Sequence, residues 1–181
     1  MTKTIWYLHH YAGAPSIGMS YRPYYLTREF NKLGFNAYVI AASFHHLLNR
    51  QVDQKQPVQL EQVDGVPFIW LKTPRYVGNG IKRLLNMFAY AWQIKRQAKK
   101  IIEITQKPDV IIVSSSHPIH FLTASTLAKK YNAKLIFEVR DIWPLSLIEI
   151  LGVSPKHPFV LLLDWIETRA YKKADCVASI S

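Results

Sequence analysis

Apolar runs alternate with longer amphipathic stretches along the whole chain. Runs rich in Ile, Val, Leu and Phe predict strands over residues 4–9, 36–41, 67–71, 109–114, 134–139 and 175–180. Most of these runs are continuously apolar, which is typical of parallel strands covered on both faces. Stretches with helical spacing predict helices over residues 21–33, 81–105, 120–131, 145–151 and 159–173. This alternation predicts an α/β fold with a Rossmann-like, doubly wound, mostly parallel sheet.

Glycine and proline positions support these boundaries. Gly34 follows the first predicted helix, where a glycine commonly takes the left-handed conformation that ends a helix. Pro108 ends the second helix directly before a strand, because proline cannot continue a helix. Residues 43–66 are more polar and contain the turn signal Asp64-Gly65, so they form either an excursion or a hairpin before the third strand. We expect one domain over residues 1–181.

The composition indicates the cellular compartment and the chemical class of the partner. The single cysteine, Cys176, excludes a disulfide framework and fits a reducing compartment. The N-terminus lacks the pattern of a signal peptide, and no apolar run reaches the ~18 residues of a spanning helix. We therefore expect a cytoplasmic protein. Its formal net charge of +11 favours an anionic partner, which is a phosphorylated ligand, a nucleic acid or an acidic membrane surface.

The loop after the first strand is the first candidate binding segment. It runs into a helix through Gly13, Ala14, Gly18 and Met19, and such a turn brings backbone N–H groups near an anion. The glycine spacing matches neither G-x-G-x-x-G nor a Walker A sequence. The loop is predicted to cradle a phosphate or a sugar; the alternative is a plain strand-to-helix turn.

Two further segments follow strands that we expect to end at the same edge of the sheet, where α/β proteins bind ligands. His117 follows three serines and precedes a proline, where an imidazole can bind a hydroxyl or accept a proton; alternatively it only begins a helix. The segment 138–144 holds Arg140 and Asp141. The alternative for this pair is an internal ion pair, or an aspartate that caps the next helix.

Metal and serine hydrolase sites find little support. Adjacent histidines such as His9 and His10 point to opposite sides of a strand, and no carboxylate or cysteine shares a helical face with them, so we expect no metal. Neither a G-x-S-x-G elbow nor a Ser-His-Asp arrangement is present, so serine hydrolase chemistry is not expected.

Basic charge concentrates in residues 72–107, which carry Lys and Arg against a single acidic residue, Glu103. The predicted helix 81–105 has an apolar stripe formed by Ile81, Leu84, Leu85, Phe88, Ala91 and Trp92. A basic amphipathic helix with aromatic residues fits an anionic lipid surface. The residues expected to face that surface are Lys95, Arg96, Lys99 and Lys100. The alternative is an ordinary surface helix whose stripe packs on the sheet.

Several motifs together resemble a known family. Residues 7–13 and 18–23, the Ser115-Ser116-His117-Pro118 run, residues 138–144 and residues 174–181 are similar in order and spacing to bacterial family 4 glycosyltransferases with the GT-B fold. The likeness is to the N-terminal half of enzymes that build cell-surface polysaccharides such as lipopolysaccharide. It spans the whole chain, and its most specific element is Arg140-Asp141-Ile142-Trp143-Pro144.

The resemblance implies an activity and a set of site residues. Members move a sugar, with retention, from a nucleotide-sugar donor to an acceptor that is often polyprenyl-linked, and no further cofactor or metal is expected. The implied catalytic residues are Asp141 and His117, the latter facing the donor sugar. The loop of Gly13, Ala14, Gly18 and Met19 would face the donor phosphates. The implied acceptor side comprises Arg140, Trp143, His10, Tyr21 and Arg22.

The family's second half, which binds the nucleotide sugar through a Glu-x7-Glu motif, has no counterpart here, since no Glu is followed by another eight positions later. We therefore expect the acceptor-side half of an enzyme, inactive alone and attached peripherally to the inner face of the cell membrane. Two other functions stay open. Half of a nucleotide-sugar epimerase would not need the basic helix, and a non-enzymatic nucleic-acid or membrane-binding domain is favoured by charge alone, although strands buried on both faces leave no aromatic platform for RNA.

Overall fold

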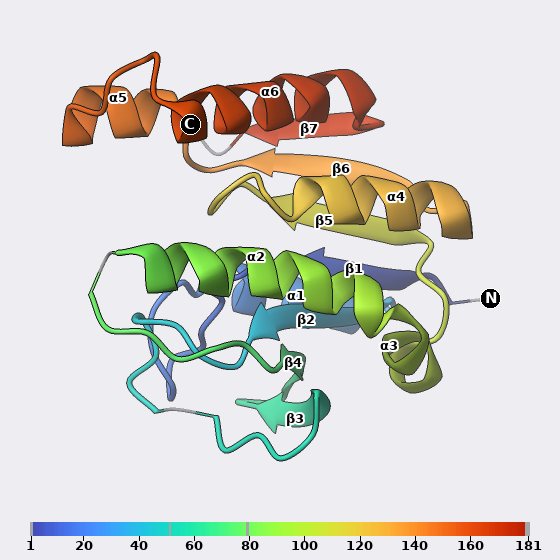
Figure 1. The fold of residues 1–181 in the computed structure, drawn as a ribbon. Coiled ribbons are helices and arrows are strands. Elements are labelled where there is room, and N and C mark those ends of the chain that lie inside the picture. The colour runs from blue at the N-terminus through green and yellow to red at the C-terminus, as the bar shows by residue number, and fades with distance from the viewer. Residues whose placement is uncertain (1, 51, 79, 180–181) are drawn as a thin grey trace.

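One sheet of seven strands organises the computed structural model, which describes residues 2–50, 52–78 and 80–179. The strand order is β3-β4-β2-β1-β5-β6-β7 (Figure 1). Neighbouring strands are parallel except β3 and β4, which are antiparallel. The strands are β1 (Thr4–Leu8), β2 (Asn36–Ala42), β3 (Val58–Val63), β4 (Val66–Leu71), β5 (Val110–Ser114), β6 (Lys134–Val139) and β7 (Cys176–Ser179).

Helices cover both faces of this sheet, so the predicted doubly wound α/β architecture is confirmed. In Figure 1, α2, α4 and α6 form one layer in front of the sheet, and α1 lies behind it. The helices are α1 (Arg22–Lys32), α2 (Ile81–Arg96), α3 (Ala98–Thr105), α4 (Phe121–Tyr131), α5 (Leu145–Leu151) and α6 (Pro158–Lys173). Among the described residues, no helix combines the length and the apolar character needed to cross a bilayer.

The central strand β1 shows why the strands read as continuous apolar runs. Successive side chains point to opposite faces, and helices cover both. Trp6 and Leu8 join the core beneath α2, α4 and α6, whereas Ile5 and Tyr7 pack toward α1. All four side chains are buried. The same alternation continues past the strand end and decides where the polar residues of the next segment point.

The structure decides one alternative of the sequence analysis and corrects one predicted helix. Residues 58–63 form the edge strand β3, which joins β4 through Asp64 and Gly65, both at positive φ, so the hairpin alternative is confirmed. The single predicted helix 81–105 is broken at Gln97 into α2 and α3. This break lets α3 approach the sheet, where the Thr105 hydroxyl accepts a hydrogen bond from the indole of Trp6 at 2.9 Å. Ile180, expected in the last strand, lies outside the described residues.

Candidate active site

The strand order reverses between β1 and β5. From β1 the sheet grows through β2 and β4 to β3 on one side, and through β5 and β6 to β7 on the other. The loops that follow β1, β5 and β6 leave from adjacent strands at the carboxyl edge of the sheet (Figure 1). The three candidate segments of the sequence therefore lie side by side, at the switch point where open α/β sheets bind ligands.

A buried hydrogen-bonded chain crosses this switch point on the side of α2. The Nδ1 atom of His10, just past β1, lies 2.6 Å from Nε2 of His117, which follows β5. The other ring nitrogen of His10 lies 2.6 Å from Oδ1 of Asn86 on α2. The ring of His10 is stacked between Tyr11 and Tyr90, with centroid distances of 4.3 and 4.8 Å. Both ring nitrogens of His10 are thus engaged within the protein.

The direction of these hydrogen bonds follows from Asn86. Its amide nitrogen donates to the carbonyl oxygens of Phe44 and Pro74 at 3.2 and 2.6 Å, so its Oδ1 must be the atom that faces His10. His10 therefore donates from Nε2 and accepts at Nδ1. His117 then donates from Nε2, which leaves its Nδ1 as a buried acceptor with no partner among the described residues.

Burial keeps this histidine pair uncharged. Both side chains are fully buried, and loss of hydration lowers the pKa of His10 and of His117 well below the usual value. Neighbouring histidines lower both pKa values further, as does Arg83 for His117. The lowered pKa favours the neutral ring of His117, whose Nδ1 atom is then a hydrogen-bond acceptor.

We expect Asn86→Leu to disrupt this chain. The change removes the acceptor for His10 and the donor to the carbonyl oxygens of Phe44 and Pro74, and should lower the free energy of unfolding by roughly 3 kcal/mol. Asn49→Leu, at an exposed position, is the control and should change little. In the unmodified protein, 15N NMR of the imidazoles should show His10 and His117 protonated at Nε2. A proton on Nδ1 of His10 would contradict the assignment.

A second polar cluster lies on the opposite side of the sheet, toward α1. Arg140, at the end of β6, donates from Nη1 to Nε2 of His9 at 2.8 Å and to the Ser20 hydroxyl at 3.1 Å. The buried carboxylate of Glu138 accepts from the Tyr7 hydroxyl at 2.6 Å and from Nε of Arg22 at 2.7 Å. His9 and His10 therefore point to opposite sides of the sheet, as expected for adjacent residues.

These contacts place the predicted acceptor-side residues. Arg140 and Arg22 are each bound to protein groups and still partly exposed at the carboxyl edge. Tyr21, the residue before α1, is exposed, and so is Met19 of the preceding loop. His10, in contrast, is fully buried and its ring nitrogens have protein partners, so in this structure it offers no free polar atom to an acceptor.

Asp141 is exposed and is not the partner of Arg140 in any salt bridge between described residues. The Ser115 hydroxyl fixes the turn instead: it accepts from the backbone N–H of Arg140 and of Asp141 at 2.8 and 3.1 Å, and donates to the Asp141 carbonyl oxygen at 3.0 Å. Partial loss of hydration raises the pKa of the Asp141 carboxyl group, and nearby Arg140 opposes this shift. The turn presents a carboxylate at the edge where the three segments meet.

Trp143 joins this turn to α6. Its indole N–H donates to the Ser115 carbonyl oxygen at 2.9 Å, and its backbone N–H donates to Glu167 of α6 at 3.0 Å. Burial raises the pKa of Glu167 to about 7. The predicted acceptor-side Trp143 thus also holds the Asp141 turn in place, through one bond to the β5 loop and one to α6.

The loop after β1 needs its glycines for close backbone packing. A Cβ atom on Gly13 would lie 2.2 Å from the carbonyl oxygen of Gly18, and Gly18 itself has a φ of +134°. The backbone N–H groups of Gly13, Gly18 and Met19 already donate to the carbonyl oxygens of Ser20, Ala14 and Leu47. Ala14 is buried. Phosphate binding by this loop stays a prediction, and these three N–H groups would have to be released to take part.

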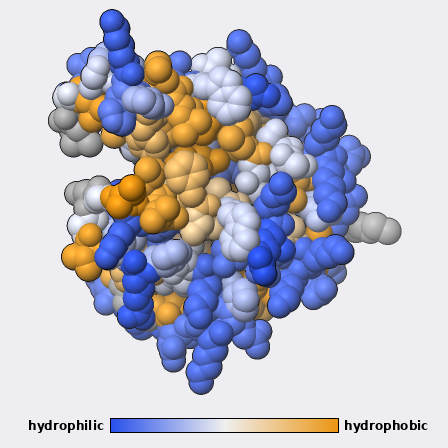
Figure 2. Space-filling view, viewed as in Figure 1, coloured by the Kyte–Doolittle hydropathy of each residue, from blue (hydrophilic) through white to orange (hydrophobic). Residues whose placement is uncertain are grey.

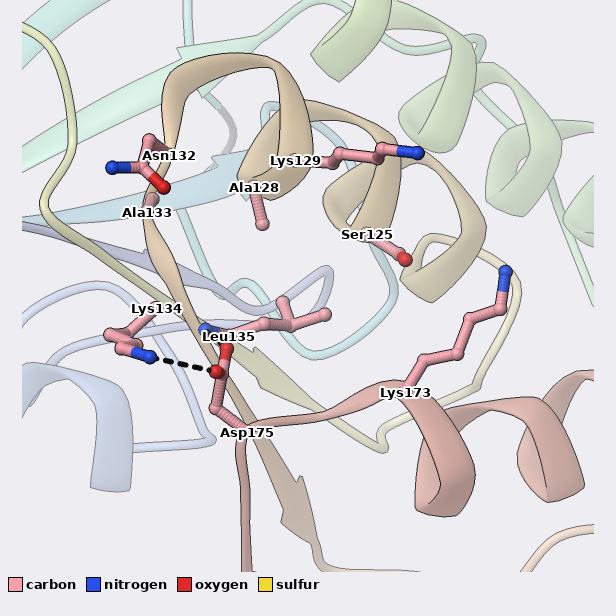
Figure 3. Close-up of a pocket in the computed structure, with 9 residues that line it drawn as sticks. All are labelled: Ser125, Ala128, Lys129, Asn132, Ala133, Lys134, Leu135, Lys173 and Asp175. Atoms are coloured by element: carbon pink, nitrogen blue, oxygen red, sulfur yellow. Dashed lines mark hydrogen bonds and ion pairs between the residues drawn. The ribbon is translucent and has the colours of Figure 1, made fainter.

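A hollow of about 570 Å³ lies at the opposite, amino edge of the sheet. Figure 3 shows the residues that line it. Lys129 and Lys173 stand over it at the C-terminal ends of α4 and α6, and Lys134 bonds to Asp175 at 3.0 Å. Cations at helix C-termini offset the negative end of the helix dipole. The lysines are explained by this stabilisation, and the hollow is remote from the loops that follow β1, β5 and β6.

The surface of α2 carries an exposed apolar stripe. The structure separates the predicted stripe into two sets: Ala91 is buried and Leu84 partly buried, whereas four residues are exposed to solvent by 40% to 74%. We call this exposed set the α2 stripe; it comprises Ile81, Leu85, Phe88 and Trp92. The predicted stripe therefore packs on the sheet only at Ala91 and, in part, at Leu84, while α2 buries Met87, Tyr90 and Ile94. The expected membrane-facing cations are all exposed, and they are Lys95, Arg96, Lys99 and Lys100.

Several residues that build the site were not predicted from the sequence. Glu138 could have been recognised as a charged residue inside an apolar strand, and Asn86 as a polar residue on the helix face that also presents Met87 and Tyr90. Ser115 and Glu167 gave no such signal. Their roles depend on which loop and which helix the fold brings together.

Comparisons with known proteins identify the family of the chain. A search of curated proteins finds no match. The family model described as a glycosyl transferase 4-like domain matches residues 18–181, which covers the Asp141 turn, His117 and most of the sheet. The chain therefore belongs to the glycosyl transferase 4-like domain family.

Proposed function

We propose that this chain is the acceptor-side half of a retaining glycosyltransferase that moves a sugar from a nucleotide-sugar donor to a lipid-linked saccharide in surface polysaccharide synthesis. The observation that carries the proposal is the meeting of three segments at the switch point of a glycosyltransferase-type domain. They supply an exposed carboxylate at Asp141, two partly exposed arginines at the carboxyl edge of the sheet, and the buried His117 with an unpaired Nδ1 among the described residues.

Each of these groups has a role in the proposed transfer. Asp141 would accept a hydrogen bond or proton from the acceptor hydroxyl as that oxygen forms the new glycosidic bond. Arg140 and Arg22 would attract the phosphate groups of either substrate, since guanidinium groups bind phosphate well. His117 is fully buried, so its Nδ1 atom would have to become accessible before it could orient a sugar hydroxyl. Stabilisation of the departing nucleotide diphosphate would come from the family's second half.

The isolated chain is expected to be inactive, because it would hold only one side of the cleft. We expect residues 1–181 alone to turn over nucleotide sugars far more slowly than ~1 s⁻¹. Release of free nucleotide diphosphate from a panel of sugar donors, with and without lipid-linked acceptors, measures this. Turnover at ordinary enzymatic rates by the isolated chain would contradict the proposal that both halves are needed for sugar transfer.

We further propose that the domain attaches to the inner face of an anionic membrane. The α2 stripe is apolar and exposed, and Arg96 lies over the ring of Trp92 at 4.8 Å, a pairing suited to the interface between lipid headgroups and acyl chains. Lys95 and the lysines at the start of α3 add positive charge beside it. A lipid-linked acceptor would be reached from this position.

Flotation with vesicles tests the attachment. We expect the chain to bind vesicles that contain phosphatidylglycerol at low salt, to ignore neutral phosphatidylcholine vesicles, and to be released by salt. Changing Lys95, Arg96, Lys99 and Lys100 to Gln should weaken binding by about three orders of magnitude, since each contributes ~1 kcal/mol. The matched control removes four charges elsewhere, at Lys3, Lys32, Lys55 and Lys107. If both variants lose vesicle binding equally, binding depends only on the net charge of the chain and not on the cations beside the α2 stripe.

A further inference from the structure

Apolar side chains also gather over α5 and α6. Four of them are between 46% and 56% exposed, and we call them the α5–α6 patch: Ile142, Leu145, Leu161 and Trp165. Leu161 and Trp165 lie one turn apart on α6, on the side opposite its buried residues Leu163 and Ala170. Large apolar side chains grouped in this way on a surface mark an interaction site more often than single exposed ones do.

The α5–α6 patch faces the same side of the molecule as the α2 stripe. In Figure 1, α2, α4 and α6 form one layer, with α4 between the other two. Both α2 and α6 bury one side against the sheet and expose apolar residues on the other. Figure 2, in the same view, shows hydrophobic surface from both regions around a hollow, with hydrophilic side chains around it.

The two regions also share a chemical pattern. Arg169 lies over the ring of Trp165 at 4.6 Å, one helical turn later, just as Arg96 lies over Trp92. On α4, between them, Lys130 is exposed, and on α6 the acidic residue Asp164 is exposed beside Trp165. The outer surface of this layer therefore combines apolar and aromatic side chains with cations. Trp and Arg favour the membrane interface, and cations attract acidic headgroups, so charge and composition both complement an anionic bilayer.

We propose that the α5–α6 patch is a second membrane contact, so that the domain rests on the bilayer through the whole α2–α4–α6 layer. This inference rests on the membrane attachment proposed above. Two separated contacts fix the orientation of the domain, which a single helix would not. Ile142 and Leu145 follow the Asp141 turn directly. The candidate active site is then held at the headgroup level, where the saccharide of a lipid-linked acceptor would lie.

The test compares two double variants on vesicles of phosphatidylglycerol mixed with phosphatidylcholine. Leu161→Gln with Trp165→Gln removes the apolar part of the α6 contact at exposed positions, so folding should survive, as circular dichroism can verify. We expect its partition to the vesicles to fall about tenfold. Leu33→Gln with Leu60→Gln, at exposed positions just after α1 and on β3, is the matched control and should bind as the unmodified chain does.

The outcomes separate this inference from the proposals on which it rests. If the α6 variant binds as well as the control, the second contact is overturned, while attachment through α2 stands provided the four-charge variant loses binding. If the unmodified chain binds no vesicles, both membrane proposals are overturned. Brominated lipid should also quench Trp165, so quenching should decrease in Trp165→Phe; unchanged quenching contradicts the contact. Sugar transfer is measured separately and is not judged by these results.

Discussion

Asp141→Asn is expected to lower kcat/KM by ~10²-fold or more in the proposed two-domain enzyme, while its Tm stays nearly unchanged. The substitution keeps the shape of the side chain and removes the carboxylate that would take a hydrogen bond or proton from the acceptor. Its backbone is held by the Ser115 hydroxyl, and the carboxylate makes no salt bridge with Arg140 among the described residues, so little stability depends on its charge.

Steady-state kinetics together with a thermal unfolding scan check this expectation. Glu103→Gln, at an exposed position on α3, is the matched control and should leave both kcat/KM and Tm as they are. A fall in Tm with Asp141→Asn would instead favour a structural role for the carboxylate. Unchanged kinetics would remove Asp141 from the proposed catalytic residues.

Acid should unfold this domain, because its core holds histidines that are neutral in the folded state. Burial lowers the pKa of His45 to about 3 and that of His120 to about 4, and lowers the pKa values of His9, His10 and His117 well below the usual value. In the unfolded chain these histidines take up protons near pH 6.5. In the folded chain they take up protons only at lower pH. The free energy of unfolding is therefore highest above pH 6.5, and it decreases as the pH falls below that value.

The size of this effect is comparable to the whole stability of a typical domain. At about pH 4.5, the shifted pKa values of His45 and His120 alone should lower the free energy of unfolding by about 5 kcal/mol relative to neutral pH. Urea unfolding followed by circular dichroism, repeated from neutral to acidic pH, measures the loss. His120→Gln should make the profile shallower, and His157→Gln, at an exposed position, should not. A stability that stays constant down to this pH would contradict the burial of neutral histidines.

The order of strands and helices could be predicted because most of the sheet is parallel and buried. Such strands are apolar throughout, and glycine and proline mark the ends of several elements, as Gly34 does after α1. The edge strand β3 was predicted only as one arm of a possible hairpin, because its central residues are half-buried or exposed and are rich in Gln and Glu. The break at Gln97 was missed because both helices keep a helical apolar spacing across it.

The site could be predicted only in part. Strand ends were readable from the sequence, so the meeting of the loops at residues 9–20, 114–118 and 138–144 was expected. The partners of individual side chains were not, because they depend on the face to which each residue points. His10 bonds to Asn86, which is 76 residues away, and Arg140 bonds to His9 and Ser20 rather than to the neighbouring Asp141.

The most direct test of the central claim follows a labelled sugar from nucleotide donors into lipid-extractable material. The enzyme that contains this domain should transfer the label from at least one nucleotide sugar to a lipid-linked saccharide, with the anomeric configuration retained, and Asp141→Asn should lose this transfer. A donor converted to its epimer without transfer, or label incorporated equally by Asp141→Asn, would contradict the account.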